Sequence, residues 1–158
     1  LLIDDGSTDD SLALCEAFAA ERPWVRVIAQ PNAGVSEARN AGIRAANGRY
    51  LFFLDPDDSL SPETLENVSM FFESCPDEID LVTYPIVSIR DGKRQRLHHR
   101  YDVLRETGVY DLTLPENATI AQATMNVAVR NCFDGNVLFD FAPAIAAPDV
   151  MPRMWHVD

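Results

Sequence analysis

The segment YLFFLDPDD (Tyr50–Asp58) decides how this chain is expected to fold. Five apolar or aromatic residues lead directly into three carboxylates, with a proline between the first and the second. A short, continuously apolar run is typical of a strand buried on both faces, as in the centre of a parallel sheet. The carboxylates would then lie at the carboxyl end of that strand, where open α/β sheets bind their ligands.

Strand and helix patterns alternate around this segment. Strands are predicted over Leu1–Asp4, Val25–Ala29, Tyr50–Leu54 and the segment 79–89, and helices over about Asp9–Arg22, Ser36–Asn47 and from Ser61 and Pro62 onward. This β-α-β order predicts an α/β fold with an open, mostly parallel sheet and helices on its faces. Beyond residue 88, a hairpin turn is expected at Asp91-Gly92.

Apolar residues at helical spacing mark the faces that two of these helices should turn toward the core. The inward residues are expected to be Leu12, Cys15, Phe18 and Ala19 in the first helix and Leu65, Val68, Phe71 and Phe72 in the third. Ser7 or Thr8 is expected to cap the first helix, and Ser61 the third.

Composition excludes several classes of protein. With 158 residues the chain is expected to form one domain, and its net charge of −12 argues against a nucleic-acid binder. The sequence contains no run of about 20 apolar residues, so no transmembrane segment is predicted. The three cysteines are expected to be reduced thiols in a cytoplasmic protein. A place at the inner face of the membrane is the alternative. The basic stretch KRQRLHHR (93–100) is either a solvated face or a contact for an anionic acceptor or lipid head group.

Five carboxylates are expected to meet at one sheet edge, because Asp4 and Asp5 follow one predicted strand and Asp55, Asp57 and Asp58 follow another. Two such charges about 6 Å apart repel by about 2–3 kcal/mol at an effective dielectric near 20. A divalent cation would relieve that repulsion, and oxygen ligands of this kind suit Mg²⁺ or Mn²⁺.

Two other interpretations of the acidic string were considered. It can serve only to cap and solvate the start of a helix. A calcium EF-hand loop would place Glu66 at its twelfth position, counted from Asp55, but Leu60 stands where that loop requires glycine and Pro62 interrupts it. The EF-hand is therefore rejected.

The series LLIDDGSTDDS, NAGVSEARNAGIRAANGRYLFFLDPDD and LSPETLEN resembles the nucleotide-sugar domain of glycosyltransferase family 2, which has the GT-A fold. The resemblance covers about residues 1–85 and rests on several motifs in the same order. The chain begins inside a strand and without methionine, so a strand that precedes Leu1 in the family is expected to be missing.

The resemblance implies roles for individual residues. Asp5 matches the aspartate that hydrogen-bonds the nucleotide base. Asp55 and Asp57 match the DxD motif, in which Asp55 lies near the ribose and metal and Asp57 is the direct metal ligand. Asp58 is an extra acid that many members carry. Arg39 lies in the matching loop and helix, with Asn32, Gly34, Ser36 and Asn40, and either faces the diphosphate or braces the carboxylates.

The second half departs from the family pattern. The family places an acceptor-side aspartate after an F-D pair, often preceded by glutamate. Here Phe139-Asp140 is followed by Asp149, but Pro148 stands where the glutamate is usual. Asp149 is the candidate general base, against the alternative of an ordinary loop aspartate. His156 is a further possible metal or phosphate contact, or incidental.

The resemblance implies an inverting, metal-dependent glycosyltransferase that moves a sugar from a nucleotide diphosphate sugar to an acceptor hydroxyl, with Mn²⁺ or Mg²⁺ as cofactor. Its acceptor would be a glycan or a lipid-linked acceptor in cell-envelope or capsule synthesis. Residues 1–88 would form the nucleotide-sugar-binding half and residues 89–158 the acceptor-side segment of the same domain. The alternatives are a non-catalytic nucleotide-sugar-binding domain and, less favoured, a sugar-nucleotide pyrophosphorylase.

Overall fold

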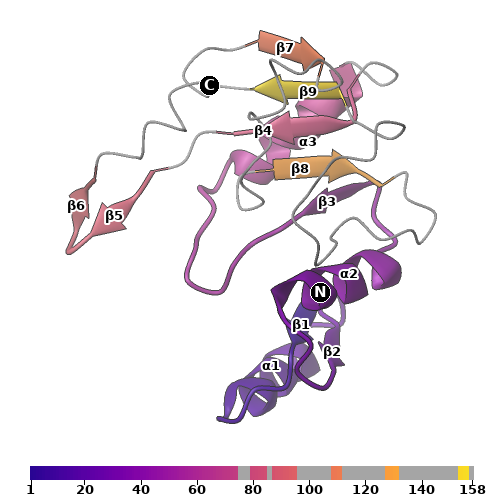
Figure 1. Ribbon diagram of the computed structural model, residues 1–158, viewed down its shortest axis with the longest axis vertical. Helices are drawn as coiled ribbons and strands as arrows, with labels where there is room; N and C mark the ends of the chain where they lie inside the picture. The colour runs from indigo at the N-terminus through magenta and orange to yellow at the C-terminus, as the bar shows by residue number, and fades with distance from the viewer. Residues whose placement is uncertain (75–78, 85–86, 96–107, 112–126, 132–152, 157–158) are drawn as a thin grey trace. The chain divides into compact units, whose positions relative to one another are not determined.

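The computed structural model describes residues 1–74, 79–84, 87–95, 108–111, 127–131 and 153–156 (Figure 1). The chain divides into two compact units: unit 1 is Leu1–Arg49 with Asn131–Ile145, and unit 2 is Tyr50–Arg130 with Ala146–Asp158. The division of function between residues 1–88 and 89–158 stays a prediction.

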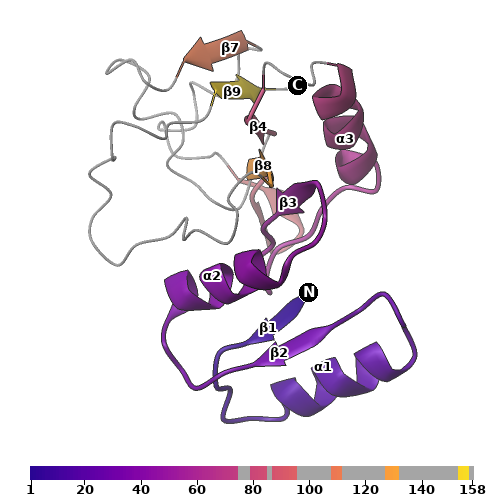
Figure 2. The ribbon, with the colours of Figure 1, turned by 90° about the vertical axis from the view of Figure 1, so that its right-hand side faces the viewer.

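Unit 1 is a small α/β layer. Its strands β1 (Leu2–Asp4) and β2 (Val27–Ala29) pair in parallel, with Asp4 opposite Ala29. Helices α1 (Ser11–Ala20) and α2 (Val35–Ala45) follow the two strands, and Figure 2 shows the strand pair lying between the helices. The predicted alternation of strand and helix is confirmed here, with helices on both sides of parallel strands.

The surface of α1 differs from the expectation. Phe18 is 47% exposed, and the Arg22 guanidinium lies 3.8 Å from the centre of its ring, so Phe18 forms a cation–π pair at the surface. The N-cap of α1 is Asp10, and no side chain caps it, so the predicted Ser7 or Thr8 cap is wrong. The Asp9 carboxylate instead accepts a hydrogen bond from the Ser11 N–H at 3.0 Å.

Unit 2 holds a five-stranded mixed sheet. Its order is β3-β8-β4-β9-β7, from strands β3 (Tyr50–Phe52), β4 (Leu81–Thr83), β7 (Gly108–Asp111), β8 (Val127–Arg130) and β9 (Arg153–His156). Only β4 and β9 pair in parallel, and the other three pairings are antiparallel. The expectation of a mostly parallel sheet is therefore wrong for this unit, although β3 and β4 run in the same direction.

The reason for this difference is the position of β8. The β-α-β pattern correctly makes β3 and β4 run the same way, but β8 lies between them and pairs antiparallel with both. In the order of this sheet β3 is an end strand, so the expectation of a central parallel strand is corrected. A short apolar run does not reveal the direction of its partner, because both kinds of pairing can bury it.

Helix α3 (Thr64–Ser74) covers one face of this sheet. Val68 and Phe72 are buried in a core cluster that also contains Val82 and Ala128, and Phe72 is fully buried. The Tyr50 ring stacks on Phe72 with centroids 4.4 Å apart.

The boundaries of α3 and its exposed face differ slightly from expectation. Thr64 starts the helix two residues after Pro62, and the Ser61 and Thr64 hydroxyls are 2.7 Å apart. Leu65 is 49% exposed, so its predicted inward position is wrong, while Phe71 packs against the core as predicted.

Strands β5 (Ile89–Arg90) and β6 (Lys93–Arg94) form a separate antiparallel hairpin. Its turn residues Asp91 and Gly92 have φ values of 52° and 69°, as a type I′ turn requires, and the predicted hairpin is confirmed. Among the helices that the structure describes, none has the length and apolar character needed to cross a membrane. Cys15 carries a free thiol.

Candidate functional site

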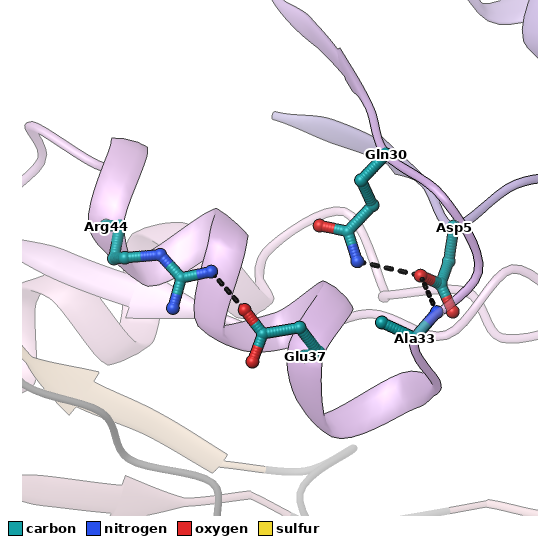
Figure 3. Close-up of polar contacts among 5 residues, drawn as sticks. All are labelled: Asp5, Gln30, Ala33, Glu37 and Arg44. Carbon is teal, nitrogen blue, oxygen red and sulfur yellow. Dashed lines mark hydrogen bonds and ion pairs between the residues drawn. The ribbon is translucent and has the colours of Figure 1, made fainter.

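The predicted base contact Asp5 lies in a loop of unit 1, where its carboxylate holds a second loop in place. Its Oδ1 accepts hydrogen bonds from Gln30 Nε2 at 2.7 Å and from the Ala33 N–H at 2.9 Å (Figure 3). Its Oδ2 accepts one from the Gly34 N–H at 2.8 Å. The hydrogen bond from the Ala33 N–H, and after it the one from the Gln30 side chain, lowers the pKa of the Asp5 carboxyl below its usual value. Desolvation opposes them, and the Gly34 N–H contributes a smaller lowering effect.

The sequence produces this arrangement through the register of two strands. Because Asp4 lies opposite Ala29, Asp5 and Gln30 are the next residues along neighbouring parallel strands, and the Gln30 N–H donates to the Asp4 carbonyl at 2.9 Å. Gly34 is the N-cap of α2, so its N–H belongs to the positive end of the helix dipole. A carboxylate at that position is electrostatically favourable.

Gly6 allows the two loops to approach each other. Its φ of +74° lies in the left-handed region, and a Cβ added there would lie 2.6 Å from the backbone nitrogen of Asn32. Asp4 is buried, and its Oδ2 accepts the Ser7 N–H at 3.3 Å. The DDGS sequence therefore combines a buried carboxylate, Asp4, with a carboxylate that holds the second loop, Asp5. Its glycine cannot be replaced by another residue unless the Asn32 backbone moves.

These contacts give Asp5 a structural role that sequence reasoning missed. A carboxylate offers about four acceptor positions, and the chain itself uses three of those on Asp5. Gln30 was also missed, although its place after β2, in register with Asp5, is the signal that could have identified it. Contact between Asp5 and a nucleotide base stays a prediction.

Helix α2 carries the predicted Arg39. Arg39 is half-buried, and its contact with a diphosphate stays a prediction. On the same helix, Arg44 and Glu37 form an ion pair (Figure 3). The Arg26 guanidinium donates to the carbonyl of Ala45 at the carboxyl end of α2, where cations are favourable.

The predicted metal ligands lie in unit 2, on the turn that follows β3. The Asp58 N–H donates to the Asp55 carbonyl at 3.0 Å, so Asp55, Asp57 and Asp58 lie on one tight turn. Asp55 is half-buried, whereas Asp57 and Asp58 are exposed. Within the described part of the chain, no group of three or more His, Cys, Asp or Glu side chains is arranged to hold a metal ion. The turn by itself thus offers at most two carboxylates to one ion, and a metal bound there would need further ligands from another source.

Tyr84 lies just after β4, and the charge of Asp58 on this turn affects its pKa. Its ring centroid lies 6.5 Å from that of Phe52, and the two strands that carry these residues both pair with β8. Burial, and secondarily the negative charge of Asp58, raise the pKa of Tyr84 to about 12. Because an ordinary tyrosine is also protonated at neutral pH, this shift changes the ionisation of Tyr84 only above about pH 10. Sequence reasoning did not select Tyr84, because its position near the turn after β3 depends on the pairing of β8 with both β3 and β4.

The remaining predicted residues are placed as follows. Asp5 belongs to unit 1 and the Asp55–Asp58 turn to unit 2, so the convergence of five carboxylates stays a prediction. Asp149 and Asp140 lie outside the described residues. The backbone of His156 is described as the last residue of β9, opposite Thr83.

Comparison with known proteins gives a consistent family. The family model for glycosyl transferase family 2 matches residues 1–142. The minor teichoic acid biosynthesis protein GgaB of Bacillus subtilis (strain 168) is 47% identical over 87 residues, which are 54% of this chain and 10% of GgaB. Chondroitin synthase of Escherichia coli is 43% identical over 65 residues, 41% of this chain and 10% of that protein. The chain thus spans about a tenth of the length of these relatives.

A solved structure shows the same fold. The crystal structure of S. aureus TarS 1-349 superposes with a TM-score of 0.61, covering 83% of this chain and 37% of TarS. Sequence identity between the two is 21%, so this likeness concerns the fold.

Proposed function

This chain belongs to glycosyl transferase family 2, and on that premise we propose that it is the nucleotide-sugar-binding part of a GT-A type glycosyltransferase. The observation that carries the proposal is the family match over residues 1–142, which includes both acidic loops. The geometry supports it, because the Ala33 and Gly34 N–H groups bond to the Asp5 carboxylate and the Asp58 N–H bonds to the Asp55 carbonyl, so each loop has a defined shape. A preorganised site loses less conformational entropy when it binds its ligand.

In this proposal the two loops divide the work of donor binding. The loop held by Asp5 lies at the amino end of α2, where described residues use three of about four acceptor positions of that carboxylate, and the fourth would receive the nucleotide base. Arg39 would face the diphosphate from α2. Asp55 and Asp57 would hold Mn²⁺ or Mg²⁺, since a single turn supplies both and hard oxygen ligands suit these ions.

The donor set of that turn fits a metal of this kind. Mg²⁺ is usually held by one or two carboxylates, with water and substrate phosphates as its other ligands, and the exposed turn leaves space for them. When bound, such an ion supplies electrostatic stabilisation of the leaving diphosphate. Asp57, the more exposed of the two predicted ligands, would contact it directly.

For the transfer itself we propose inversion at the anomeric carbon. Asp149 would take the proton from the acceptor hydroxyl, whose oxygen then forms the new bond to that carbon as the bond to the diphosphate breaks. The acceptor would be a glycan or lipid-linked acceptor of the cell envelope. The names of the relatives, a teichoic acid biosynthesis protein and a chondroitin synthase, support this substrate class.

A pair of variants tests this proposal in the complete protein. After a panel of nucleotide diphosphate sugars has been screened by thermal stabilisation, donor affinity and turnover are measured with Mn²⁺ and with EDTA. Asp57→Asn should weaken donor binding and turnover together. Asp149→Asn should keep donor affinity while turnover falls by about 10²–10⁴, the usual contribution of a positioned base.

The outcomes separate the alternatives. Equal donor affinity in EDTA would refute the metal-bridged site. Wild-type turnover by Asp149→Asn would move the base to Asp140. Donor binding without transfer to any acceptor would favour a non-catalytic nucleotide-sugar-binding domain, which the Pro148-Asp149 departure from the family pattern already suggests.

A further inference from the structure

The β5–β6 hairpin is a rigid, exposed element outside both acidic loops. Beyond its two paired positions, the Gln95 N–H donates to the Ser88 carbonyl at 2.8 Å, which extends the pairing by one residue on each strand. The Gln95 side chain also donates to the Lys93 carbonyl at 3.1 Å. Every residue from 87 to 95 is exposed.

The hairpin concentrates positive charge in an acidic chain. Residues 87–100 contain five of the 13 Lys and Arg residues but only one of the 25 Asp and Glu residues. Arg90 lies directly opposite Lys93, and Arg94 is the next residue along. Like charges directly opposite each other destabilise a strand pair. None of the three cations forms an ion pair with a described residue, so all three can contact an anion from outside.

Aliphatic side chains accompany these cations. Ile89 is 68% exposed and Val87 is 49% exposed, and the contact of these apolar side chains with water is unfavourable. Strand alternation places Arg90 and Lys93 on one face of the hairpin and Ile89 with Arg94 on the other. A soluble polyanion would neutralise the cations but leave the aliphatic residues in water. A lipid surface accommodates both, since Lys and Arg reach the head groups while aliphatic groups enter the interface.

We propose that the β5–β6 hairpin docks on an anionic phospholipid surface. Ile89 and Val87 enter the interfacial layer on the face that they share with Arg94, which contacts lipid phosphates there. Arg90 and Lys93 reach lipid phosphates from the opposite face with their long side chains. The excess of acidic residues elsewhere in the chain is repelled by the same surface, so the hairpin also selects the orientation in which the protein binds. The hairpin shares no residue with either acidic loop, so this proposal is independent of donor binding.

Vesicle flotation of the full chain tests the proposal. The protein is mixed at low salt with vesicles of phosphatidylglycerol and phosphatidylcholine, or of phosphatidylcholine alone, and bound protein is measured. Binding is expected only with the anionic lipid and should weaken as salt rises. The triple variant Arg90→Gln, Lys93→Gln, Arg94→Gln should reduce the partition coefficient by about a hundredfold, from the usual contribution of each cation near such a surface.

A matched control removes the same amount of charge elsewhere. The variant Arg22→Gln, Arg26→Gln, Arg44→Gln changes the net charge equally and should retain most of the binding. Ile89→Ser should weaken binding to vesicles but leave binding to inorganic polyphosphate unchanged. Circular dichroism of each variant establishes that it is folded.

Three results would overturn the proposal. The first is equal partitioning of the hairpin variant and the wild type. The second is equal loss in the matched control, which would assign the effect to net charge. The third is tight binding to polyphosphate with no binding to anionic vesicles, which would assign the hairpin to a soluble anionic polymer.

Discussion

Replacing Gly6 by alanine should disrupt the contact between the two loops of unit 1. The new Cβ would lie 2.6 Å from the backbone nitrogen of Asn32, a distance that requires the Asn32 loop to move. Left-handed backbone costs a non-glycine residue about 1–2 kcal/mol, and forcing atoms into packed space typically costs about 1–3 kcal/mol. The free energy of unfolding should therefore fall by about 2–5 kcal/mol.

Two other glycines separate these contributions. At Gly92 the φ is +69° and nothing lies within 4 Å of an added Cβ, so Gly92→Ala should cost only the backbone strain of about 1–2 kcal/mol. At Gly42, inside α2, the new Cβ would make an ordinary contact of 3.6 Å with Ile3. Gly42→Ala should stabilise the protein by about 0.5–1 kcal/mol through helix propensity.

Urea unfolding followed by circular dichroism gives the three stabilities, and calorimetric titration with a nucleoside diphosphate gives binding. Gly6→Ala should weaken binding, because the displaced loop carries the N–H groups that hold Asp5. Gly92→Ala and Gly42→Ala should bind as the wild type does. If Gly6→Ala were no less stable than Gly92→Ala and bound nucleotide normally, the close approach at Asn32 would not constrain the loop.

Three further variants probe the core and the titrating groups. Phe72→Ala should destabilise the protein by about 3–5 kcal/mol in urea unfolding, since it empties a fully buried site; a loss below 1 kcal/mol would contradict the described core. The pKa of Asp5 is lowered in the folded state, so its contribution to stability is present above pH 3.8 and is lost as pH falls through the lowered value; Asp5→Asn should differ from wild type near neutral pH, and this difference should shrink in acid. The pKa of Tyr84 is raised from 10.0 to about 12, so stability is lost as pH rises from 10 toward 12, by no more than about 3 kcal/mol because solvent screens a partly exposed group; Tyr84→Phe should remove that loss, and identical alkaline titration of both proteins would refute it.

The local elements of this fold were largely predictable from the sequence. The apolar run before Asp55 forms β3, and the Asp91-Gly92 pair forms the expected turn, because each depends on residues that are neighbours in the chain. Errors of this local kind concern single side chains. Leu65 and Phe18 follow helical spacing but remain exposed. Apolar spacing identifies one face of a helix, but it does not show how much of that face is buried.

Long-range pairing was not predictable in the same way. Nothing near Tyr50 or Leu81 indicates that β8 lies between their strands, because pairing of distant strands leaves no local signal. The role of Asp5 shows the same limit: the residue was selected for its charge and position, whereas its contacts with Gln30 and Gly34 arise from the β1–β2 register.

The place of β8 also constrains how the protein is made. During synthesis β3 and β4 emerge first, and each has an edge of unpaired N–H and C=O groups until residues 127–130 arrive. Such open edges readily pair with other chains. A chain that is cut after residue 88 keeps both acidic loops and helix α3 but lacks the strand that joins β3 to β4. We therefore expect it to aggregate, so the shortest soluble piece of unit 2 has to extend at least to Arg130.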